Sequence, residues 1–350
     1  MLLCKQGDSD SCLTAPQVAA LKKIYSGPVD AKGKQMFPGF LPGGEQGPGG
    51  WTTWISMGPG KDWQGLFANG FFTNMITADQ PVDLKTINVE TAVQMANEQQ
   101  GKTFNATDPN LKAFMGHGGK LIVYHGWSDA ALPPLGSIRY FDSVKTALGA
   151  RETDSFMRLY MVPGMYHCAG GPGATNFGEI APAGDAQHDI QLALEQWVEK
   201  GTEPDRIVAT KYAGQYQSKV EFTRPLCAYP ESAVYKGEGD ATDAANFDCV
   251  MDREEPGSGI TANLNPPRAL KAHEPDFPPE KRGMEGTVVL AIIVGVDGIP
   301  YNIKVVRSLD PAFDEASIKA VKRWKFAPAT RDGKPVPVKM KIEIAFHQHR

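Results

Sequence analysis

Two short apolar runs, each followed by a helical pattern, constrain most strongly what this chain can fold into. Lys120–His125 (KLIVYH) and Phe156–Val162 (FMRLYMV) are nearly continuous apolar stretches, as strands buried on both faces of a parallel sheet are. Ser137–Leu148 and Asp189–Lys200 follow them with apolar residues at helical spacing. The order strand, helix, strand, helix predicts an α/β fold with a doubly wound parallel sheet.

The segment before this pattern has a different composition. Leu13–Tyr25 predicts a helix with Thr14 as its N-cap. Gly27–Gly70 is dense in glycine, proline and tryptophan, which is typical of a lid or an insertion and not of regular core elements. Its aromatic residues either fill a loop-rich satellite core or contact a substrate. The candidates for a substrate-contacting lid are Trp51, Trp54, Phe71 and Phe72.

Beyond residue 251 the pattern changes again. Asp252–Pro279 is rich in proline, glycine and charge without any periodicity, and we interpret it as a linker. Asp297-Gly298 is a strong two-residue hairpin signal. Around it we expect, in order, a strand at Gly286–Val296, a strand at Ile299–Ser308, a helix capped by Asp314 and running through Phe326, and a strand at Val336–Phe346. The predicted domains are residues 1–117, residues 118–250, a linker at 251–277 and a C-terminal domain at 278–350.

Charge and hydropathy argue against several classes of function. The chain carries 36 Lys and Arg against 40 Asp and Glu, so nucleic acid is not expected as its main partner. Lysine and arginine concentrate from Lys319 onward, either as a solvated basic face or as a binding surface. The longest apolar run, Val288–Val296, is far shorter than the roughly 18 residues of a membrane span. The first residues, MLLCKQGDSD, lack the basic start and apolar stretch of a signal peptide.

The five cysteines point to an oxidising compartment. Cys4 and Cys12 bracket a short polar loop, and Cys227 and Cys249 bracket a segment with little apolar content. A disulfide at either place would stabilise a loop that builds no core, by roughly 3 kcal/mol. No Cys-x-x-Cys pair is present, so zinc is a poor fit. Cys168 is left without a partner.

One acidic residue and one histidine follow the two predicted strands. Asp129 lies in the turn after the first strand, and His167 lies in the turn after the second. In hydrolases built on a parallel sheet, the acid and the histidine of a Ser-His-Asp triad come from turns of this kind, in this order. We therefore expect Asp129 to orient the imidazole of His167, and His167 to act as the general base.

No residue is predicted as the nucleophile. The sequence has no Gly-x-Ser-x-Gly turn, and Ser128, which comes closest, shares its turn with the candidate acid. Gly257-Ser258-Gly259 lies in the predicted linker and is interpreted as a flexible spacer. His117, His125 and His188 have no metal-ligand spacing, and His188 stands where a helix cap is expected.

From about Leu2 to Cys249 the chain resembles the tannase and feruloyl esterase family of secreted serine esterases. The segments that carry the resemblance are CLTAPQVAALKKIYSGP, FPGFLPGGE, GGKLIVYHGWSDAALPP, RLYMVPGMYHCAGGPG, RPLCAYPESAVYKG and NFDC. The resemblance implies an α/β-hydrolase fold, of which this chain would hold the C-terminal half and part of a lid insertion. It also implies that Asp129 and His167 are the catalytic acid and base.

The same resemblance gives the cysteines their expected roles. It implies the disulfides Cys4–Cys12 and Cys227–Cys249, and for Cys168 a bond to a cysteine beside the nucleophile. The family's serine turn, its oxyanion residues and the calcium-binding loop of its lid are expected to precede Met1. We therefore expect no cofactor and no metal in this chain.

From about Pro278 to Phe346 the chain resembles the TonB C-terminal domain, a small α+β fold. The resemblance rests on EGTVVLAIIVGVDGIPYNIKVVRS, on FDEASIKAVKRWKFAPA and on the closing strand. It implies a periplasmic domain that binds outer-membrane transporters, although a purely structural or dimerising module is an alternative.

Together these interpretations predict an extracytoplasmic two-domain chain. Its expected activity is hydrolysis of aromatic esters such as galloyl or feruloyl esters, and without the serine half the chain alone is expected to be inactive. Two alternatives remain: a periplasmic adaptor whose function lies in the C-terminal domain, and an inactive product of gene truncation and fusion.

Overall fold

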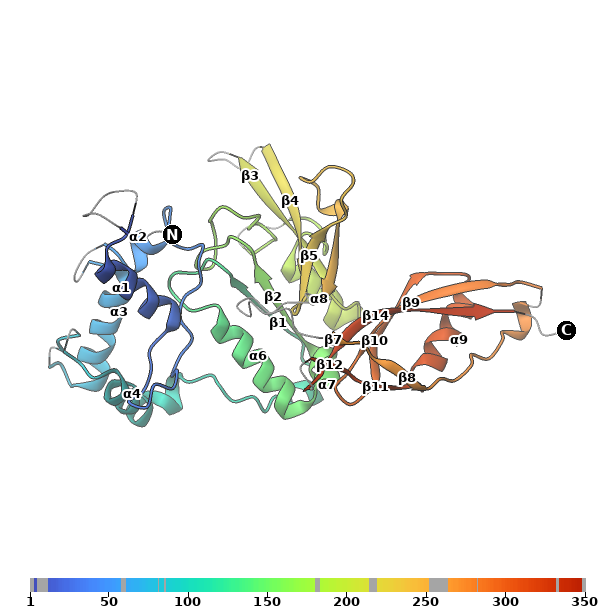
Figure 1. The fold of residues 1–350 in the computed structure, drawn as a ribbon, viewed down its shortest axis with the longest axis horizontal. Helices are drawn as coiled ribbons and strands as arrows, with labels where there is room; N and C mark the ends of the chain where they lie inside the picture. The colour runs from blue at the N-terminus through green and yellow to red at the C-terminus, as the bar shows by residue number, and fades with distance from the viewer. Residues whose placement is uncertain are drawn as a thin grey trace. The chain divides into compact units, whose positions relative to one another are not determined.

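The computed structural model describes residues 3–4, 12–57, 61–80, 82–84, 86–179, 183–213, 219–251, 264–281, 283–331 and 334–347. The chain forms two compact units, labelled by element in Figure 1. The first comprises Met1–Leu148, Phe156–Tyr229 and Ala233–Cys249. The second comprises Gly149–Ser155, Pro230–Ser232 and Val250–Arg350. No helix within the described ranges is long and apolar enough to cross a membrane.

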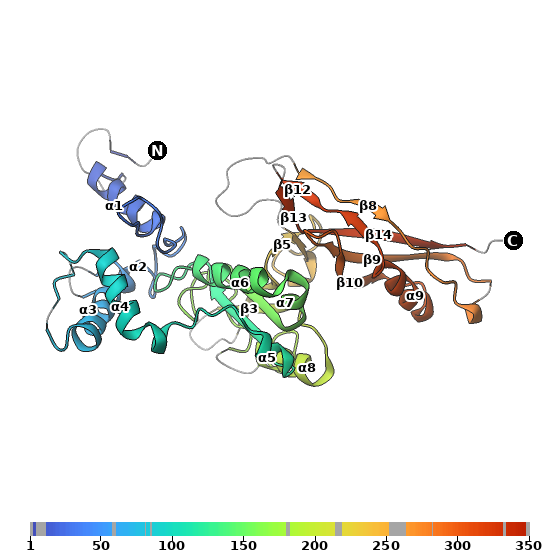
Figure 2. The same ribbon diagram turned by 90° about the horizontal axis from the view of Figure 1, so that it is seen from below.

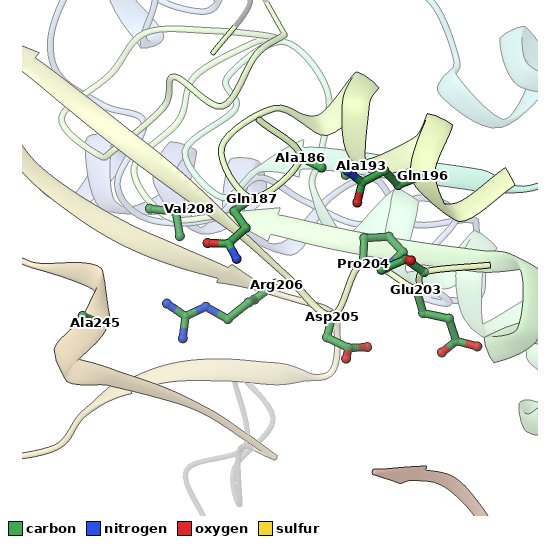
Figure 3. A pocket seen from close by; sticks show the side chains of 11 residues that line it. Ala186, Gln187, Ala193, Gln196, Glu203, Pro204, Asp205, Arg206, Val208 and Ala245 are labelled. Carbon is green, nitrogen blue, oxygen red and sulfur yellow. The ribbon is translucent and has the colours of Figure 1, made fainter. Parts of the chain in front are cut away.

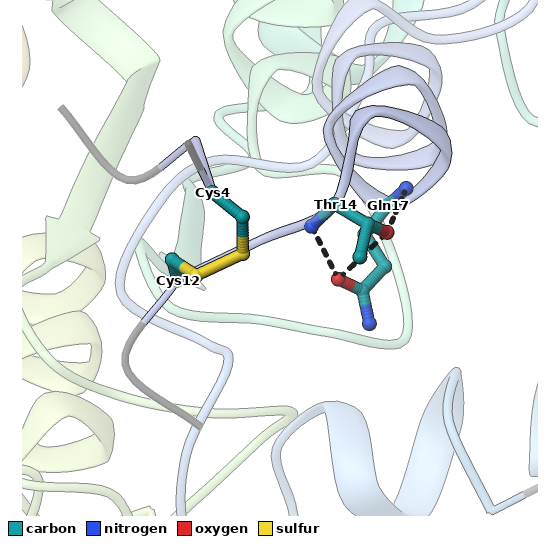
Figure 4. Close-up of a disulfide and its surroundings, with 4 residues drawn as sticks. All are labelled: Cys4, Cys12, Thr14 and Gln17. Carbon is teal, nitrogen blue, oxygen red and sulfur yellow. Dashed lines mark hydrogen bonds between the residues drawn. A yellow bond between two sulfur atoms is a disulfide. The ribbon is translucent and has the colours of Figure 1, made fainter. Parts of the chain in front are cut away.

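The first unit begins with short helices. They are α1 (Ala15–Ser26), α2 (Trp51–Trp54), α3 (Trp63–Phe71), the π-helix η1 (Phe72–Ile76), α4 (Val89–Phe104) and α5 (Lys112–Gly116). The prediction of α1 is confirmed, and Thr14 caps it: its backbone N–H donates to Oε1 of Gln17 over 2.7 Å (Figure 4). The segment Gly27–Gly70, which was expected to hold no regular core elements, contains α2 and the start of α3. Helix α3 buries no residue, and Asp62 caps it by accepting a hydrogen bond from the backbone N–H of Gly65.

The predicted parallel pair is present. Strands β1 (Leu121–Gly126) and β2 (Met157–Val162) are paired in parallel, from Leu121 opposite Met157 to Gly126 opposite Val162. Helix α6 (Leu135–Leu148) buries Ile138, Phe141 and Val144, which share a core cluster with Met157 and Leu159 of β2. Helices α7 (Ala150–Phe156) and α8 (Ile190–Lys200) flank β2 in sequence.

Antiparallel strands complete this unit and were not predicted. Strand β3 (Arg206–Ala213) pairs with β4 (Lys219–Cys227), and β5 (Glu231–Tyr235) pairs with β6 (Phe247–Met251). Ile207 of β3 and Leu226 of β4 are buried in one cluster with Tyr160 of β2. The core of the first unit therefore joins the parallel pair to the hairpin.

The second unit is built on a three-stranded antiparallel sheet. Its order is β10-β9-β14, and α9 lies along it (Figures 1 and 2). The bounds are β9 (Gly286–Val294), β10 (Pro300–Arg307), α9 (Pro311–Val321) and β14 (Val338–Phe346). The predicted hairpin is confirmed, but its turn is longer than the two residues Asp297-Gly298: Val294 pairs with Pro300, and the N–H of Gly298 donates to the carbonyl of Gly295. Gly298 has φ 74°, which glycine adopts without strain. The core cluster gathers apolar residues from β9 and β14 with Phe313 and Val321 of α9.

Two details of this unit differ from the prediction. The cap of α9 is Asp310 and not Asp314, because Oδ1 of Asp310 accepts from the backbone N–H of Ala312 over 3.0 Å and Pro311 occupies the first turn. The helix also ends at Val321 and not at Phe326, because a turn follows it and β11 begins at Lys325. The short strands are β7 (Leu264–Asn265), β8 (Arg268–Lys271), β11 (Lys325–Ala327), β12 (Ala329–Arg331) and β13 (Lys334–Val336). Strands β7 and β8 lie inside the predicted linker. Strand β7 pairs with β12, and β8 pairs with β11, so these strands form because they have partners far along the chain.

Candidate active site

Backbone hydrogen bonds continue beyond the ends of β1 and β2, between the segments that follow the two strands. The N–H of Trp127 donates to the carbonyl of Val162 over 2.9 Å, and the N–H of Ser128 donates to the carbonyl of Met165 over 3.0 Å. A Cβ atom at Gly126 would lie 2.2 Å from the carbonyl oxygen of Met165, so this approach requires glycine. The turn that follows β1 is thus held against the turn that follows β2.

This contact brings Asp129 and His167 together. Nδ1 of His167 lies 3.0 Å from Oδ2 of Asp129. The other oxygen, Oδ1, accepts hydrogen bonds from the backbone N–H groups of Ala131 (2.7 Å) and Leu132 (2.9 Å). Asp129 is only 4% exposed, whereas the His167 side chain is 33% exposed. Since Asp129 occupies Nδ1, the opposite ring nitrogen, Nε2, is the one that can exchange a proton with a reacting group.

A second histidine shares the same carboxylate oxygen. Nε2 of His125 lies 3.1 Å from Oδ2 of Asp129, and Nδ1 of His125 lies 2.7 Å from the hydroxyl of Ser137. Sequence reasoning considered His125 only as a metal ligand and missed this contact. The signal that could have revealed it is its position at the end of the strand, four residues before the acid in the same turn.

The carboxyl of Asp129 is ionised at neutral pH. Burial raises its pKa, but hydrogen bonds from His125, from the Leu132 N–H, from His167 and from the Ala131 N–H outweigh burial. The net result is a pKa below the ordinary value of an aspartic acid. A buried, ionised and fully hydrogen-bonded carboxylate is suited to orient an imidazole and to stabilise its charged form.

Aromatic rings from α2 and α3 form a cluster that contacts His167 through Trp54. The Trp54 ring is T-shaped against the imidazole, with centroids 5.2 Å apart. Trp63 (5.8 Å) and Phe67 (6.2 Å) pack on Trp54 in turn, and they are 47% and 60% exposed. We call Trp54, Trp63 and Phe67 the aromatic wall. It offers apolar surface next to the imidazole.

The remaining lid candidates lie elsewhere in the aromatic packing. Trp51 is buried and its ring centroid lies 5.5 Å from that of Tyr25. Phe71 packs on Phe72 and on Phe104 of α4. Of the four candidates from the sequence, Trp54 is therefore the one in ring contact with His167 within the described chain. Trp63 and Phe67 belong to the same aromatic-rich segment but were not among the four candidates.

The other residues that the sequence singled out do not join this group. Ser128 is buried, and its carbonyl oxygen is so close to Gly44 that a Cβ there would lie 2.6 Å from it. His117 contacts the carbonyl of Ala113, and His188 pairs with Asp185 on the surface. Gly257-Ser258-Gly259 falls outside the described residues. Among the described residues, no group of three or more His, Cys, Asp or Glu side chains is arranged so that it could hold a metal ion.

Both expected disulfides are present. Cys4–Cys12 precedes α1 (Figure 4), and Cys227–Cys249 joins β4 to β6. Cys168, next to His167, is a free and exposed thiol. Its backbone has φ 63°, so the residue sits in a tight left-handed turn beside the imidazole.

A pocket of about 620 Å³ lies between α8 and the start of β3 (Figure 3). It is lined by residues including Gln187, Gln196, Glu203, Asp205, Arg206 and Ala245. None of Asp129, His125 and His167 lines it, and the guanidinium of Arg206 donates to the carbonyl of Ala244. We therefore do not assign this pocket to the group around His167.

Comparison with known proteins places the chain in a family. Residues 1–250 match the family model described as tannase and feruloyl esterase. The chain belongs to the tannase and feruloyl esterase family. Residues 274–347 match the model of the Gram-negative bacterial TonB protein C-terminal, so a TonB C-terminal domain follows the esterase part.

Relatives and solved structures agree with this assignment. An uncharacterized esterase of Xanthomonas campestris is 41% identical over 71% of this chain and 48% of its own length. The mono(2-hydroxyethyl) terephthalate hydrolase of Piscinibacter sakaiensis is 30% identical over 71% of this chain and 44% of its own. The structure of feruloyl esterase B from Aspergillus oryzae superposes with a TM-score of 0.63 at 29% identity, covering 71% of this chain and 49% of that one. The first unit therefore has the α/β-hydrolase fold of these esterases, and the chain spans about half the length of the relatives it matches.

Proposed function

We propose that this chain carries the acid and the base of a serine carboxylic ester hydrolase. The observation that supports this most directly is the 3.0 Å contact between Nδ1 of His167 and the buried Oδ2 of Asp129, at the carboxyl ends of adjacent parallel strands. Membership of an esterase family supports the same reaction class. The nucleophilic serine is proposed to come from polypeptide that this sequence does not contain, since no Gly-x-Ser-x-Gly turn occurs in it.

The proposed chemistry is acyl transfer through the serine. Nε2 of His167 removes the proton from the serine hydroxyl while the serine oxygen forms a bond to the ester carbonyl carbon. The imidazolium then gives that proton to the departing alcohol as the carbon–oxygen bond of the ester breaks. In the second half, His167 takes a proton from water, the hydroxide attacks the acyl carbon, and the proton returns to the serine oxygen as the free acid leaves. Asp129 stabilises the imidazolium in both halves.

The proposed substrates are esters of aromatic acids. The aromatic wall places Trp54 against His167, and the exposed rings of Trp63 and Phe67 extend that apolar surface. Flat aromatic acyl groups gain free energy from stacking on such rings in addition to burial of apolar area. Feruloyl and terephthalate groups, which occur in the names of two matched relatives, are of this kind.

Complementation tests the proposal. This chain is produced in the periplasm together with the part of the Xanthomonas esterase that it does not match, and release of ferulate from ethyl ferulate is measured. We expect turnover only when both parts are present. His167→Ala should lower the turnover by roughly 10⁴-fold or more, because the serine loses its general base. His188→Ala is the matched control, since His188 also pairs with a carboxylate through Nδ1 but lies on the surface.

Two results contradict the proposal. Turnover by the complemented pair that survives His167→Ala would remove His167 from the chemistry. Turnover by this chain alone that His167→Ala abolishes would mean that the nucleophile lies within this sequence. Ethyl butyrate serves as the aliphatic control. Equal turnover of both esters would refute the preference for aromatic esters but would still support the proposed hydrolase activity.

A second function is proposed for the C-terminal unit. The match of residues 274–347 to the TonB C-terminal model supports contact with an outer-membrane transporter. The two disulfides and this domain together support an extracytoplasmic location. Retention of the chain by an immobilised plug peptide of a TonB-dependent transporter tests the contact, with a scrambled peptide as control. Equal retention by both peptides would argue for a purely structural module.

A further inference from the structure

His125 uses both of its ring nitrogens inside the proposed active site. Its side chain is 12% exposed, and it sits at the end of β1 between Asp129 and the first turns of α6. Nε2 lies 3.1 Å from Oδ2 of Asp129 and 3.3 Å from the carbonyl oxygen of Leu132. Nδ1 lies 2.7 Å from the hydroxyl oxygen of Ser137.

These contacts fix where the hydrogen atoms are. An ionised carboxylate and a carbonyl can only accept, so Nε2 of His125 must carry the hydrogen; the other tautomer would turn a lone pair toward two acceptors. In the neutral imidazole, Nδ1 then has a lone pair, and the hydroxyl of Ser137 donates to it. The network therefore has one direction, from Ser137 through His125 to Asp129.

The same direction reaches His167. Oδ1 of Asp129 is held by two backbone N–H groups, and Oδ2 is held by His125 on one side and faces His167 on the other. With its four contacts in place, the carboxylate group cannot rotate away from His167. We propose that His125, locked by Ser137, is a positioning residue that keeps Asp129 turned toward His167 and so keeps the hydrogen of His167 on Nδ1. The inference deepens the proposed esterase function and rests on it.

The alternative is that His125 only fills space at the end of the strand. The two roles differ in what they do to His167, because a space-filling residue does not change which nitrogen of a neighbouring ring carries the hydrogen. The tautomer of His167 is therefore the informative quantity, and it can be measured without any turnover.

The experiment is nitrogen and proton NMR of the histidine rings in the full chain, labelled on histidine. Gln at position 125 carries an amide N–H as far from Cα as the imidazole Nε2, whereas Asn is one bond too short. We expect His125→Asn to lower the ratio of the Nδ1–H to the Nε2–H tautomer of His167 by roughly tenfold, about the worth of one hydrogen bond. His125→Gln should restore most of this ratio. Ser137→Ala should lower the ratio as His125→Asn does, but by less.

The ring signals of His188 provide the internal control. They should stay unchanged in every variant, because the Asp185 pairing of His188 is independent of β1. An unchanged His167 tautomer in a folded His125→Asn chain overturns the inference. If that variant does not fold, an unchanged His167 tautomer in Ser137→Ala overturns it.

The outcome is separable from that of the proposed function. If His125→Asn lowers the Nδ1–H tautomer of His167 but the chain shows no complementation, the positioning role of His125 is supported and the proposed esterase function is refuted. Complemented turnover with an unaffected tautomer would keep the esterase and remove the positioning role.

Discussion

Replacing Phe313 by Ala tests whether the C-terminal unit is stabilised by its own core. Phe313 is fully buried on α9. Its ring centroid lies 4.7 Å from that of Phe346 on β14 and 5.3 Å from that of Phe277. The side chain thus joins the helix to the sheet and to the segment before β9.

The expected loss follows from this burial. Removing a buried phenylalanine side chain costs about 3–5 kcal/mol, because transfer free energy is lost and a cavity remains. A domain the size of the TonB-type match, residues 274–347, has an unfolding free energy of only about 4–11 kcal/mol, from roughly 0.05–0.15 kcal/mol per residue. We therefore expect Phe313→Ala to remove about 4 kcal/mol and to leave the unit marginally stable or unfolded.

Fluorine NMR of the full chain labelled with 5-fluorotryptophan measures each unit separately. Of the six tryptophans, Trp324 lies in the second unit and contacts Phe326, whereas Trp197 is buried in the first. In urea, Phe313→Ala should lower the transition midpoint of the Trp324 resonance and leave that of Trp197 unchanged. Leu270→Ala, at an exposed position of β8, is the control and should change the free energy by less than about 0.5 kcal/mol.

The reasoning is refuted by either of two results. A change below about 1 kcal/mol at Trp324 would mean that the Phe313 cluster does not stabilise the unit as its burial implies. An equal shift at Trp197 would mean that the two units unfold as one.

Two further predictions concern the first unit. The pKa of Asp129 is lowered on folding, so its contribution to stability is present above the unfolded value of about 4 and is lost as the pH falls through the lower folded value. Urea unfolding followed at Trp197 should therefore show a fall in stability in acid that Asp129→Asn reduces, and an equal fall in the variant would contradict this. Replacing Cys227 and Cys249 by serine should lower the unfolding free energy by about 3 kcal/mol in the same assay, because the unfolded chain gains conformational entropy without the disulfide. An unchanged transition midpoint would contradict this explanation.

Local patterns in the sequence were enough for several elements of the fold. The positions of β1 and β2, within one residue at each end, and their parallel pairing followed from continuous apolar runs separated by a helix, because such runs have no solvent-facing side. The β9–β10 hairpin followed from Asp297-Gly298, because glycine at positive φ closes the turn, although the turn is longer than the two residues that this pair predicts.

Elements whose partners are distant in sequence were not predictable in this way. Strand β8 lies in a segment without periodicity and is a strand because β11, far along the chain, pairs with it. The predicted N-cap of α9, Asp314, is wrong, because Asp310 and Asp314 are both residues of the type preferred at a helix N-cap. The backbone geometry decided for Asp310.

At the candidate site, the sequence alone determined which residues follow the ends of β1 and β2. That was enough to select Asp129 and His167, since the carboxyl ends of adjacent parallel strands meet at one edge of a sheet. The tertiary structure alone decided that His125 shares the Asp129 carboxylate, and that Trp54 rather than Trp51 faces the imidazole. The physical reason is that a strand end fixes the position of a turn, whereas the direction of each ring and each hydrogen bond depends on what packs against it.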